Sequence, residues 1–167
     1  MGANTHPSGY AAVYELTGGP TDDWVQKGTT ISGIAGDWVG WNVDINHDGT
    51  VIAVNSKEAP TATKHGHTKV YRMSAGETDW TQIGNTIPGQ SAGDQDGYHR
   101  ALSLAASANR VAISSLANGG TVDTRVFELA SGSSTWVQLG SNITDSGIGT
   151  YNSLSLNNDG TMMVVGD

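Results

Sequence analysis

Short apolar runs recur along the chain and are separated by glycine, serine, asparagine and aspartate. The stretch NVDIN, which begins at Asn42, alternates apolar and polar positions, so Val43 and Ile45 share one face of a strand. The stretch TVIAV, which begins at Thr50, is a continuous apolar run that suits a strand buried on both faces. No long run of good helix formers shows a period of 3.6 residues. The pattern predicts many short strands and almost no helix.

One phrase occurs three times at a constant spacing. DWVQKGTTI begins at Asp23, DWTQIGNTI at Asp79 and TWVQLGSNI at Thr135, so the three tryptophans lie 56 residues apart. A second phrase, which reads AVYEL, KVYRM or RVFEL, precedes each tryptophan. A third element follows each of these three tryptophans, before the next copy of the second phrase where there is one. It reads NVDINHDGTVIAV, ALSLAASANRVAIS or SLSLNNDGTMMVV. Repetition at a fixed period indicates that one supersecondary unit has been copied three times.

Each copy reads as four strands, a to d. Strand a is NVDIN or its counterpart, strand b is TVIAV, strand c is AVYEL, and strand d carries the tryptophan and its V-Q-x-G tail. Asp48-Gly49 and Asp159-Gly160 supply hairpin turns between strands a and b, because glycine adopts positive φ without steric cost. The middle copy has lost this Asp-Gly turn. Repeated units of four short antiparallel strands are typical of propeller blades.

These phrases resemble the β-propeller repeat families of the WD40, kelch and FG-GAP kind. The S-L-x-x-D-G-x-x-V-V-G element looks like their inner strand pair, and W-x-Q-x-G resembles a strand of other multi-blade propellers. The resemblance covers nearly the whole chain and implies an all-β propeller, but no activity, because propellers host binding, scaffolding and catalysis alike. The chain lacks the GH…WD signature, the kelch double glycine and a full calcium loop in every copy. A β-trefoil, a β-sandwich and a disordered chain are the alternatives.

The chain begins in the middle of one four-strand unit and ends in the middle of another, so it divides into whole and partial blades. Residues 1–28 hold strands c and d of a split blade, 29–84 and 85–140 are whole blades, and 141–167 hold strands a and b. These three blade-equivalents are too few for a propeller, which has roughly four to eight blades. We expect a homodimer in which two chains close a six-blade ring through exposed strand edges. Nine blades from three chains, and a fragment of a larger propeller, are alternatives.

Charge and composition narrow the classes of partner. The formal net charge is −8, which disfavours nucleic acid and anionic membrane surfaces. The absence of cysteine excludes disulfides, thiolate catalysis and thiolate metal sites. No apolar stretch has transmembrane length, and MGANTHPSGY lacks the regions of a signal peptide, so neither is expected and the compartment stays unknown.

The loops between strand d and the next strand a carry aromatic and acidic residues. Aromatic rings stack on the apolar face of a sugar, and nearby carboxylate and amide oxygens can hold its hydroxyl groups. The alternative is that these rings pack between neighbouring blades, since aromatic side chains contribute mostly as buried area. The candidate ligand-binding residues are Trp38, Trp41, Tyr98, Tyr151, Asp37, Asp94, Asp96 and Asn152.

Two further groups of residues have weak metal-site patterns. One imitates the start of a calcium loop, D-x-N-x-D-G, but its twelfth position is Asn55 instead of a carboxylate. The other combines histidines from two loops expected on the same face, which could hold zinc. Turn chemistry and exposed loop positions explain both groups more simply, so we expect no metal and no cofactor. The candidates are Asp44, Asn46 and Asp48 for calcium, and His65, His67 and His99 for zinc.

The sequence contains no recognisable catalytic frame. It has no G-x-S-x-G nucleophile turn and no glycine-rich stretch that opens a helix. We therefore expect a non-enzymatic β-propeller module for protein–protein binding or scaffolding. A lectin-like, glycan-binding propeller is the alternative, and a propeller glycoside hydrolase is a weaker one.

Overall fold

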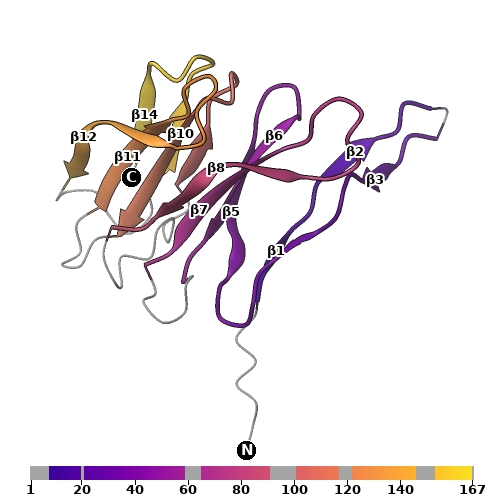
Figure 1. The fold of residues 1–167 in the computed structure, drawn as a ribbon, viewed down its shortest axis with the longest axis horizontal. Coiled ribbons are helices and arrows are strands. Elements are labelled where there is room, and N and C mark those ends of the chain that lie inside the picture. The colour runs from indigo at the N-terminus through magenta and orange to yellow at the C-terminus, as the bar shows by residue number, and fades with distance from the viewer. Residues whose placement is uncertain are drawn as a thin grey trace, which may run out of the picture.

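The fold is all-β, as the sequence predicts. Every regular element in the described part of the chain is a strand, and no helix that could cross a membrane is found there. Figure 1 shows the strands as a row of sheets that runs from the N-terminal strands to the C-terminal hairpin. The computed structural model describes residues 8–19, 21–58, 65–90, 101–116, 122–145 and 153–166.

Two four-stranded antiparallel sheets form the middle of this row. The first sheet has the order β5-β6-β7-β8 and the second has the order β9-β10-β11-β12, so neighbours in sequence are neighbours in the sheet. Short connections favour this arrangement, because antiparallel strands can be joined by tight hairpins. The bounds are β5 Val39–Ile45, β6 Val51–Ser56, β7 His67–Arg72, β8 Thr81–Pro88, β9 Leu102–Leu104, β10 Arg110–Leu116, β11 Val122–Glu128 and β12 Val137–Asp145.

Smaller strand pairs flank the two sheets. At the N-terminal side β1 pairs with β4 and β2 pairs with β3, and at the C-terminal side β13 pairs with β14. The flanking pairs lie at opposite ends of the row, and the sheets formed by the described residues do not close on one another (Figure 1). The bounds are β1 Tyr10–Ala11, β2 Tyr14–Leu16, β3 Trp24–Gln26, β4 Ile31–Ser32, β13 Ser153–Leu156 and β14 Met163–Gly166.

In each full sheet the third and fourth strands, β7 with β8 and β11 with β12, share a register irregularity at the same place. In the two full sheets the register shifts between Thr68 and Val70 and between Thr124 and Val126. At the N-terminal side the corresponding strands are interrupted, which divides them into the pairs β1–β4 and β2–β3. A glycine with positive φ lies in the facing strand each time, as is usual for a bulge. Equivalent pairs on one side of the shift are Ala11–Ile31, Thr68–Ile87 and Thr124–Ile143.

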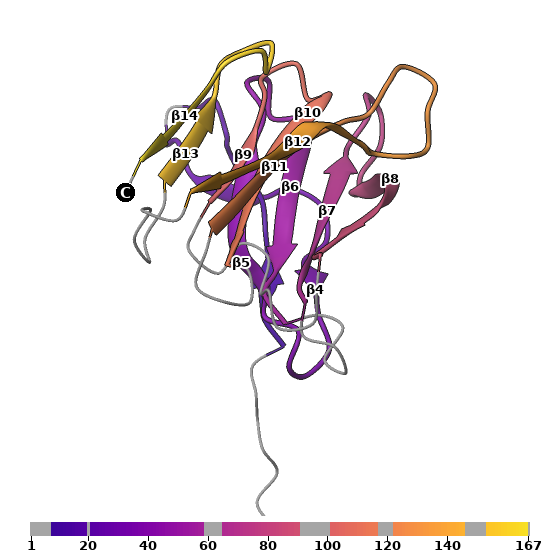
Figure 2. The same ribbon diagram turned by 90° about the vertical axis from the view of Figure 1, so that its left-hand side faces the viewer.

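The main core lies between the two full sheets, which Figure 2 shows one in front of the other. All six residues of β6 are buried, as predicted for an apolar inner strand. Val51 and Ala53 of β6 share one apolar cluster with Leu102 and Leu104 of β9. Removal of this apolar surface from water is the main stabilising contribution to the pairing of the sheets.

A tryptophan seated over a glycine joins each sheet to the one before it. The Trp136 indole Nε1 donates to the Ile83 carbonyl over 3.1 Å, and its ring lies against Gly84. A Cβ at Gly84 would lie 2.6 Å from the Trp136 ring, so only glycine leaves room for it. Trp80 is seated in the same way over Gly28. We call this arrangement the tryptophan–glycine joint.

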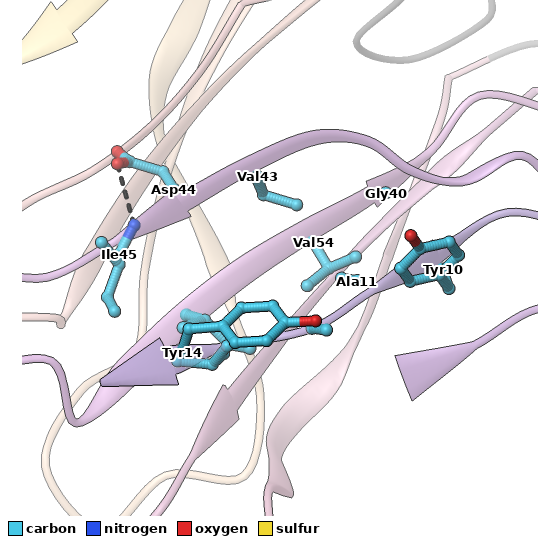
Figure 3. A pocket seen from close by; sticks show the side chains of 11 residues that line it. Tyr10, Ala11, Tyr14, Gly40, Val43, Asp44, Ile45 and Val54 are labelled. Carbon is cyan, nitrogen blue, oxygen red and sulfur yellow. Dashed lines mark hydrogen bonds between the residues drawn. The ribbon is translucent and has the colours of Figure 1, made fainter. Parts of the chain in front are cut away.

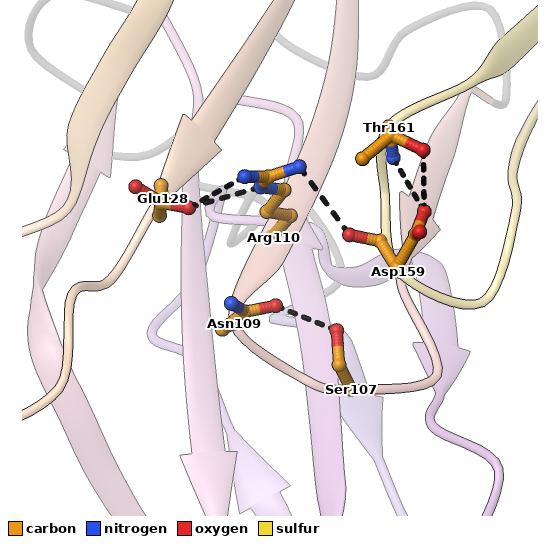
Figure 4. Close-up of polar contacts among 6 residues, drawn as sticks. All are labelled: Ser107, Asn109, Arg110, Glu128, Asp159 and Thr161. Carbon is orange, nitrogen blue, oxygen red and sulfur yellow. Dashed lines mark hydrogen bonds and ion pairs between the residues drawn. The ribbon is translucent and has the colours of Figure 1, made fainter.

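The β9–β10 turn keeps its shape without glycine. Ala108 adopts φ 60° where the turns of the other copies have Gly49 and Gly160 at φ 71° and 69°. Figure 4 shows the neighbouring polar contacts, in which Arg110 donates to Glu128 over 2.9 Å and to the Asp159 carbonyl over 3.4 Å. These contacts tie the turn of the second sheet to the C-terminal hairpin.

Acid is expected to weaken the joint between the N-terminal strands and the first full sheet. Asp79 accepts hydrogen bonds from the backbone and hydroxyl of Thr29, at 2.9 and 2.7 Å, and these bonds lower its pKa from the ordinary value of 3.8. Because the pKa is lower in the folded state, this stabilisation is complete above about pH 4 and is lost as the pH falls through the folded-state pKa. Melting temperatures between about pH 7 and pH 2 should therefore fall less in Asp79→Asn than in the wild type. Parallel curves for the two proteins would contradict this role of Asp79.

Candidate functional site

The β4–β5 connection and the start of the β6–β7 connection lie at the same end of the strands, because β5 begins and β6 ends there (Figure 1). The first connection carries Asp37 and Trp38, and Trp41 follows near the start of β5. The second connection begins with Lys57 and Glu58 directly after β6. The Glu58 amide donates to the Asp37 carbonyl over 3.3 Å, which ties the two connections together. We call this region the loop end.

An aromatic pair lies at the loop end. The rings of Trp38 and Trp41 meet edge to face, with centroids 5.6 Å apart and planes at 85°. The Lys57 ammonium lies 4.8 Å from the Trp41 centroid and 5.5 Å from that of Trp38, within range of a cation–π interaction with both. Trp38 has φ 55°, a left-handed conformation that is uncommon for a bulky residue and is found at functional sites.

Two buried polar atoms beside this pair have no hydrogen-bond partner within the described structure: Asp37 Oδ1 and Trp38 Nε1. The other carboxylate oxygen, Asp37 Oδ2, accepts from the Ile34 amide over 3.2 Å and holds the turn. Buried polar groups are normally paired, so these two unpaired atoms at the loop end call for an explanation.

A pocket of about 240 Å³ opens between β4 and the first full sheet. Alternate residues of β7, His67, Lys69 and Tyr71, line it together with Asp37. Burial raises the pKa of the Tyr71 phenol, so the phenol keeps its proton at neutral pH and can donate a hydrogen bond. The pocket therefore combines donors on β7 with the acidic side chain of the loop end.

The second full sheet differs from the first at the counterpart of Lys69, which lines this pocket. Arg125 is the counterpart of Lys69 in the second sheet, and it is only 4 % exposed. Its guanidinium fills the corresponding space, donating to the Pro88 carbonyl over 3.2 Å and to Ser115 Oγ over 3.4 Å. Lys69 has a single ammonium group in place of the planar guanidinium group, and the space beside it is open.

The chain matches no protein-family model, and no curated protein is significantly similar to it. Assignment of a function therefore rests on the geometry of the loop end. The features that distinguish it are the aromatic pair under Lys57, the two unpaired polar atoms and the pocket lined by β7.

The residues of the calcium-like pattern take part in turn hydrogen bonds. Asn46 Oδ1 accepts from the Thr50 and Val51 amides at 3.0 and 2.9 Å, and Asp48 Oδ1 accepts from the Thr50 amide and hydroxyl. The Thr50 bonds lower the pKa of the exposed Asp48 carboxyl. Asp44 Oδ2 accepts from a backbone amide of β9 over 2.6 Å. The described residues contain no group of three or more His, Asp or Glu side chains that could hold a metal ion.

The structure brings together only part of the predicted ligand-binding set. Asp37, Trp38 and Trp41 meet at the loop end, and His67 lines the pocket beside them. Sequence reasoning missed Lys57, Lys69 and Tyr71. The alternation in HTKVYR was an available signal, because it places residues 67, 69 and 71 on one face of a strand. The remaining candidates lie outside the described residues: Tyr98, Tyr151, Asp94, Asp96, Asn152 and His99.

Proposed function

We propose that the chain is a non-enzymatic β-propeller module that binds a protein partner at its loop end. The repeated order of four antiparallel strands, the shared bulge and the tryptophan–glycine joints support reading the two full sheets as neighbouring blades. Loops on such a rigid scaffold are where binding residues are usually presented.

The observation that carries the proposal is the combination of aromatic area and unpaired polar atoms at the loop end. Trp41 is 37 % exposed and lies next to the buried, unpaired Asp37 Oδ1 and Trp38 Nε1. Tryptophan is enriched among residues that dominate protein–protein binding energy. Because these two atoms are buried, a partner backbone, which offers both a donor and an acceptor, would reach them only if the loop end opened.

Peptides selected against the wild-type chain from a displayed library test this proposal. Trp41→Ala removes aromatic contact area, and Lys69→Arg is expected to close the pocket as Arg125 does in the second sheet. Each variant should weaken peptide binding about tenfold or more, as measured by calorimetry. Val137→Ala, an exposed apolar change on the far sheet, is the matched control and should bind normally. Peptides that bind all of these variants equally would contradict the proposal.

Glycan binding at the same loop end is a second candidate, favoured by the unpaired donor and acceptor beside an exposed indole. A sugar that stacked on the face of Trp41 next to Lys57 would have to displace the Lys57 ammonium. A multivalent glycan array separates the two candidates. Protein recognition predicts no sugar-dependent signal, whereas a signal lost in Trp41→Ala would establish the glycan reading instead.

A further inference from the structure

The three equivalent tryptophans have different surroundings. Trp80 and Trp136 are 9 % and 5 % exposed and sit over the glycine of the preceding unit, whereas Trp24 is 65 % exposed. At the opposite end of the row, a Cβ at Gly140 would meet nothing within 4 Å, although Gly140 has φ 68° like its two occupied counterparts. One end therefore carries an unseated tryptophan and the other an unfilled glycine seat.

The polar groups beside Trp24 and beside Gly140 match those that surround the tryptophan–glycine joint at Trp80. In the joint at Trp80, the carboxylate of Asp79 binds the Trp80 amide and the hydroxyl of Thr29. Asp23 already binds the Trp24 amide over 2.8 Å in the same way. Ser141 follows Gly140 as Thr29 follows Gly28, so a hydroxyl stands at the equivalent position of the other end.

The inner strands show the same complementarity. Leu102 and Leu104 of β9 are 8 % and 5 % exposed because they pack on the first full sheet, whereas their counterparts Val43 and Ile45 of β5 are 59 % and 48 % exposed. On the C-terminal hairpin the exposed large apolar side chains are Met162 and Val164, at 71 % and 66 %. Their counterparts in β6, Val51 and Ala53, are almost fully buried against the next sheet.

A groove of about 520 Å³ separates the N-terminal strands from β5 and β6. Figure 3 shows Tyr10 and Tyr14 on one side of this groove and Val43 and Ile45 on the other. In the full sheets, the corresponding position next to the third strand is filled by strands a and b of the same blade. The groove thus has the place and the apolar lining expected for an inner strand pair.

We propose that a second copy of this chain places its β13–β14 hairpin in this groove, while Trp24 of the first copy fills the Gly140 seat of the second. The two strands of the hairpin then lie beside β1 and β2, which are followed by β3 and β4. Because β1 with β2, and β3 with β4, each count as one interrupted strand, the result is a four-stranded sheet built from two chains. Met162 and Val164 of one copy cover Val43 and Ile45 of the other. The groove and the hairpin lie at opposite ends of each chain (Figure 1), so each copy can offer its hairpin to one contact and its groove to another. In the proposed ring, two copies make two such identical contacts.

The register of the hybrid sheet can be derived from the full sheets. Ala53 lies opposite Val70 and Ala112 opposite Val126, and the corresponding pair between copies is Val164 and Val13. The chain has no cysteine, so Val13→Cys combined with Val164→Cys gives a specific cross-link test. Mild oxidation should yield covalent dimers of this variant, whereas Val13→Cys with Val165→Cys should not cross-link, because successive side chains point to opposite faces. Equal yields, or monomers only, would overturn the proposal.

A second measurement is independent of the cross-link. Trp24→Ala and Gly140→Ala should each raise the dimer dissociation constant in sedimentation equilibrium, by about 30-fold for the tryptophan. The matched controls are Trp41→Ala, a partly exposed tryptophan that packs with Trp38 and Lys57 at the loop end, and Gly132→Ala, a glycine at φ 77° with nothing within 4 Å. Controls that dissociate as readily as the two test variants would overturn the proposal. Peptide binding at the loop end responds to Trp41→Ala instead, so failure of the dimer and failure of the loop-end function are distinguishable.

Discussion

Replacement of Trp136 by alanine is expected to lower the free energy of unfolding by about 3–5 kcal/mol, the usual cost of truncating a buried tryptophan. Trp136 is 5 % exposed, belongs to the main core cluster and donates from Nε1 to the Ile83 carbonyl. Its removal leaves a cavity over Gly84 and an unpaired carbonyl between the two full sheets. Because folded domains are stable by only about 5–15 kcal/mol, the urea midpoint should fall severely.

Trp24→Ala is the matched control for that experiment. Trp24 occupies the equivalent position but is 65 % exposed within its own chain. Its replacement should change the urea midpoint only through dimerisation, so the effect should depend on protein concentration, whereas that of Trp136→Ala should persist at every concentration. Equal, concentration-independent losses for the two variants would show that seating over glycine does not distinguish them.

Gly84→Ala is expected to cost about 2–5 kcal/mol, combining the strain of a left-handed residue with overpacking. Gly84 has φ 69°, and the added methyl group would lie 2.6 Å from Cδ1 and Nε1 of Trp136. The tryptophan would have to leave its seat, and its hydrogen bond to Ile83 would be lost. Urea unfolding, together with the Trp136-dependent near-ultraviolet circular dichroism, measures both consequences.

Gly132→Ala isolates the backbone contribution to this effect. Gly132 has φ 77° with open space around its Cβ position, so the substitution should cost only about 1–2 kcal/mol. The difference between the two variants reports the tryptophan contact. If Gly84→Ala were no worse than Gly132→Ala, the close approach of the Trp136 ring would not exist in solution.

Local patterns in the sequence were sufficient to predict the inner strands. Alternation in NVDIN and the apolar run after Asp48-Gly49 correspond to β5 and β6, because burial selects side chains with the period of a strand. The sequence did not reveal that Val43 and Ile45 stay exposed in the chain, since exposure depends on which sheet packs next to them. Ala108 shows a similar limit, because its turn is kept in shape by neighbouring contacts instead of by glycine.

The candidate site could be predicted only in part, for a related reason. Asp37, Trp38 and Trp41 are close in sequence and therefore close in space. The pocket beside them is lined by Lys69, whose counterpart Arg125 fills the corresponding space in the second sheet, and this difference is a property of packing between sheets. No local pattern encodes such a difference, although comparison of Lys69 with Arg125 in the aligned copies points to the position.

The molar mass of the wild-type chain in solution is the most direct test of the proposed ring. Light scattering after size exclusion at micromolar concentration should give twice the chain mass of 17.3 kDa, with no larger species. Such a closed pair is expected when two identical contacts satisfy both open ends of each copy. A mass of 17.3 kDa at the highest soluble concentration, or an open-ended series of oligomers, would contradict closure of the ring by a second copy.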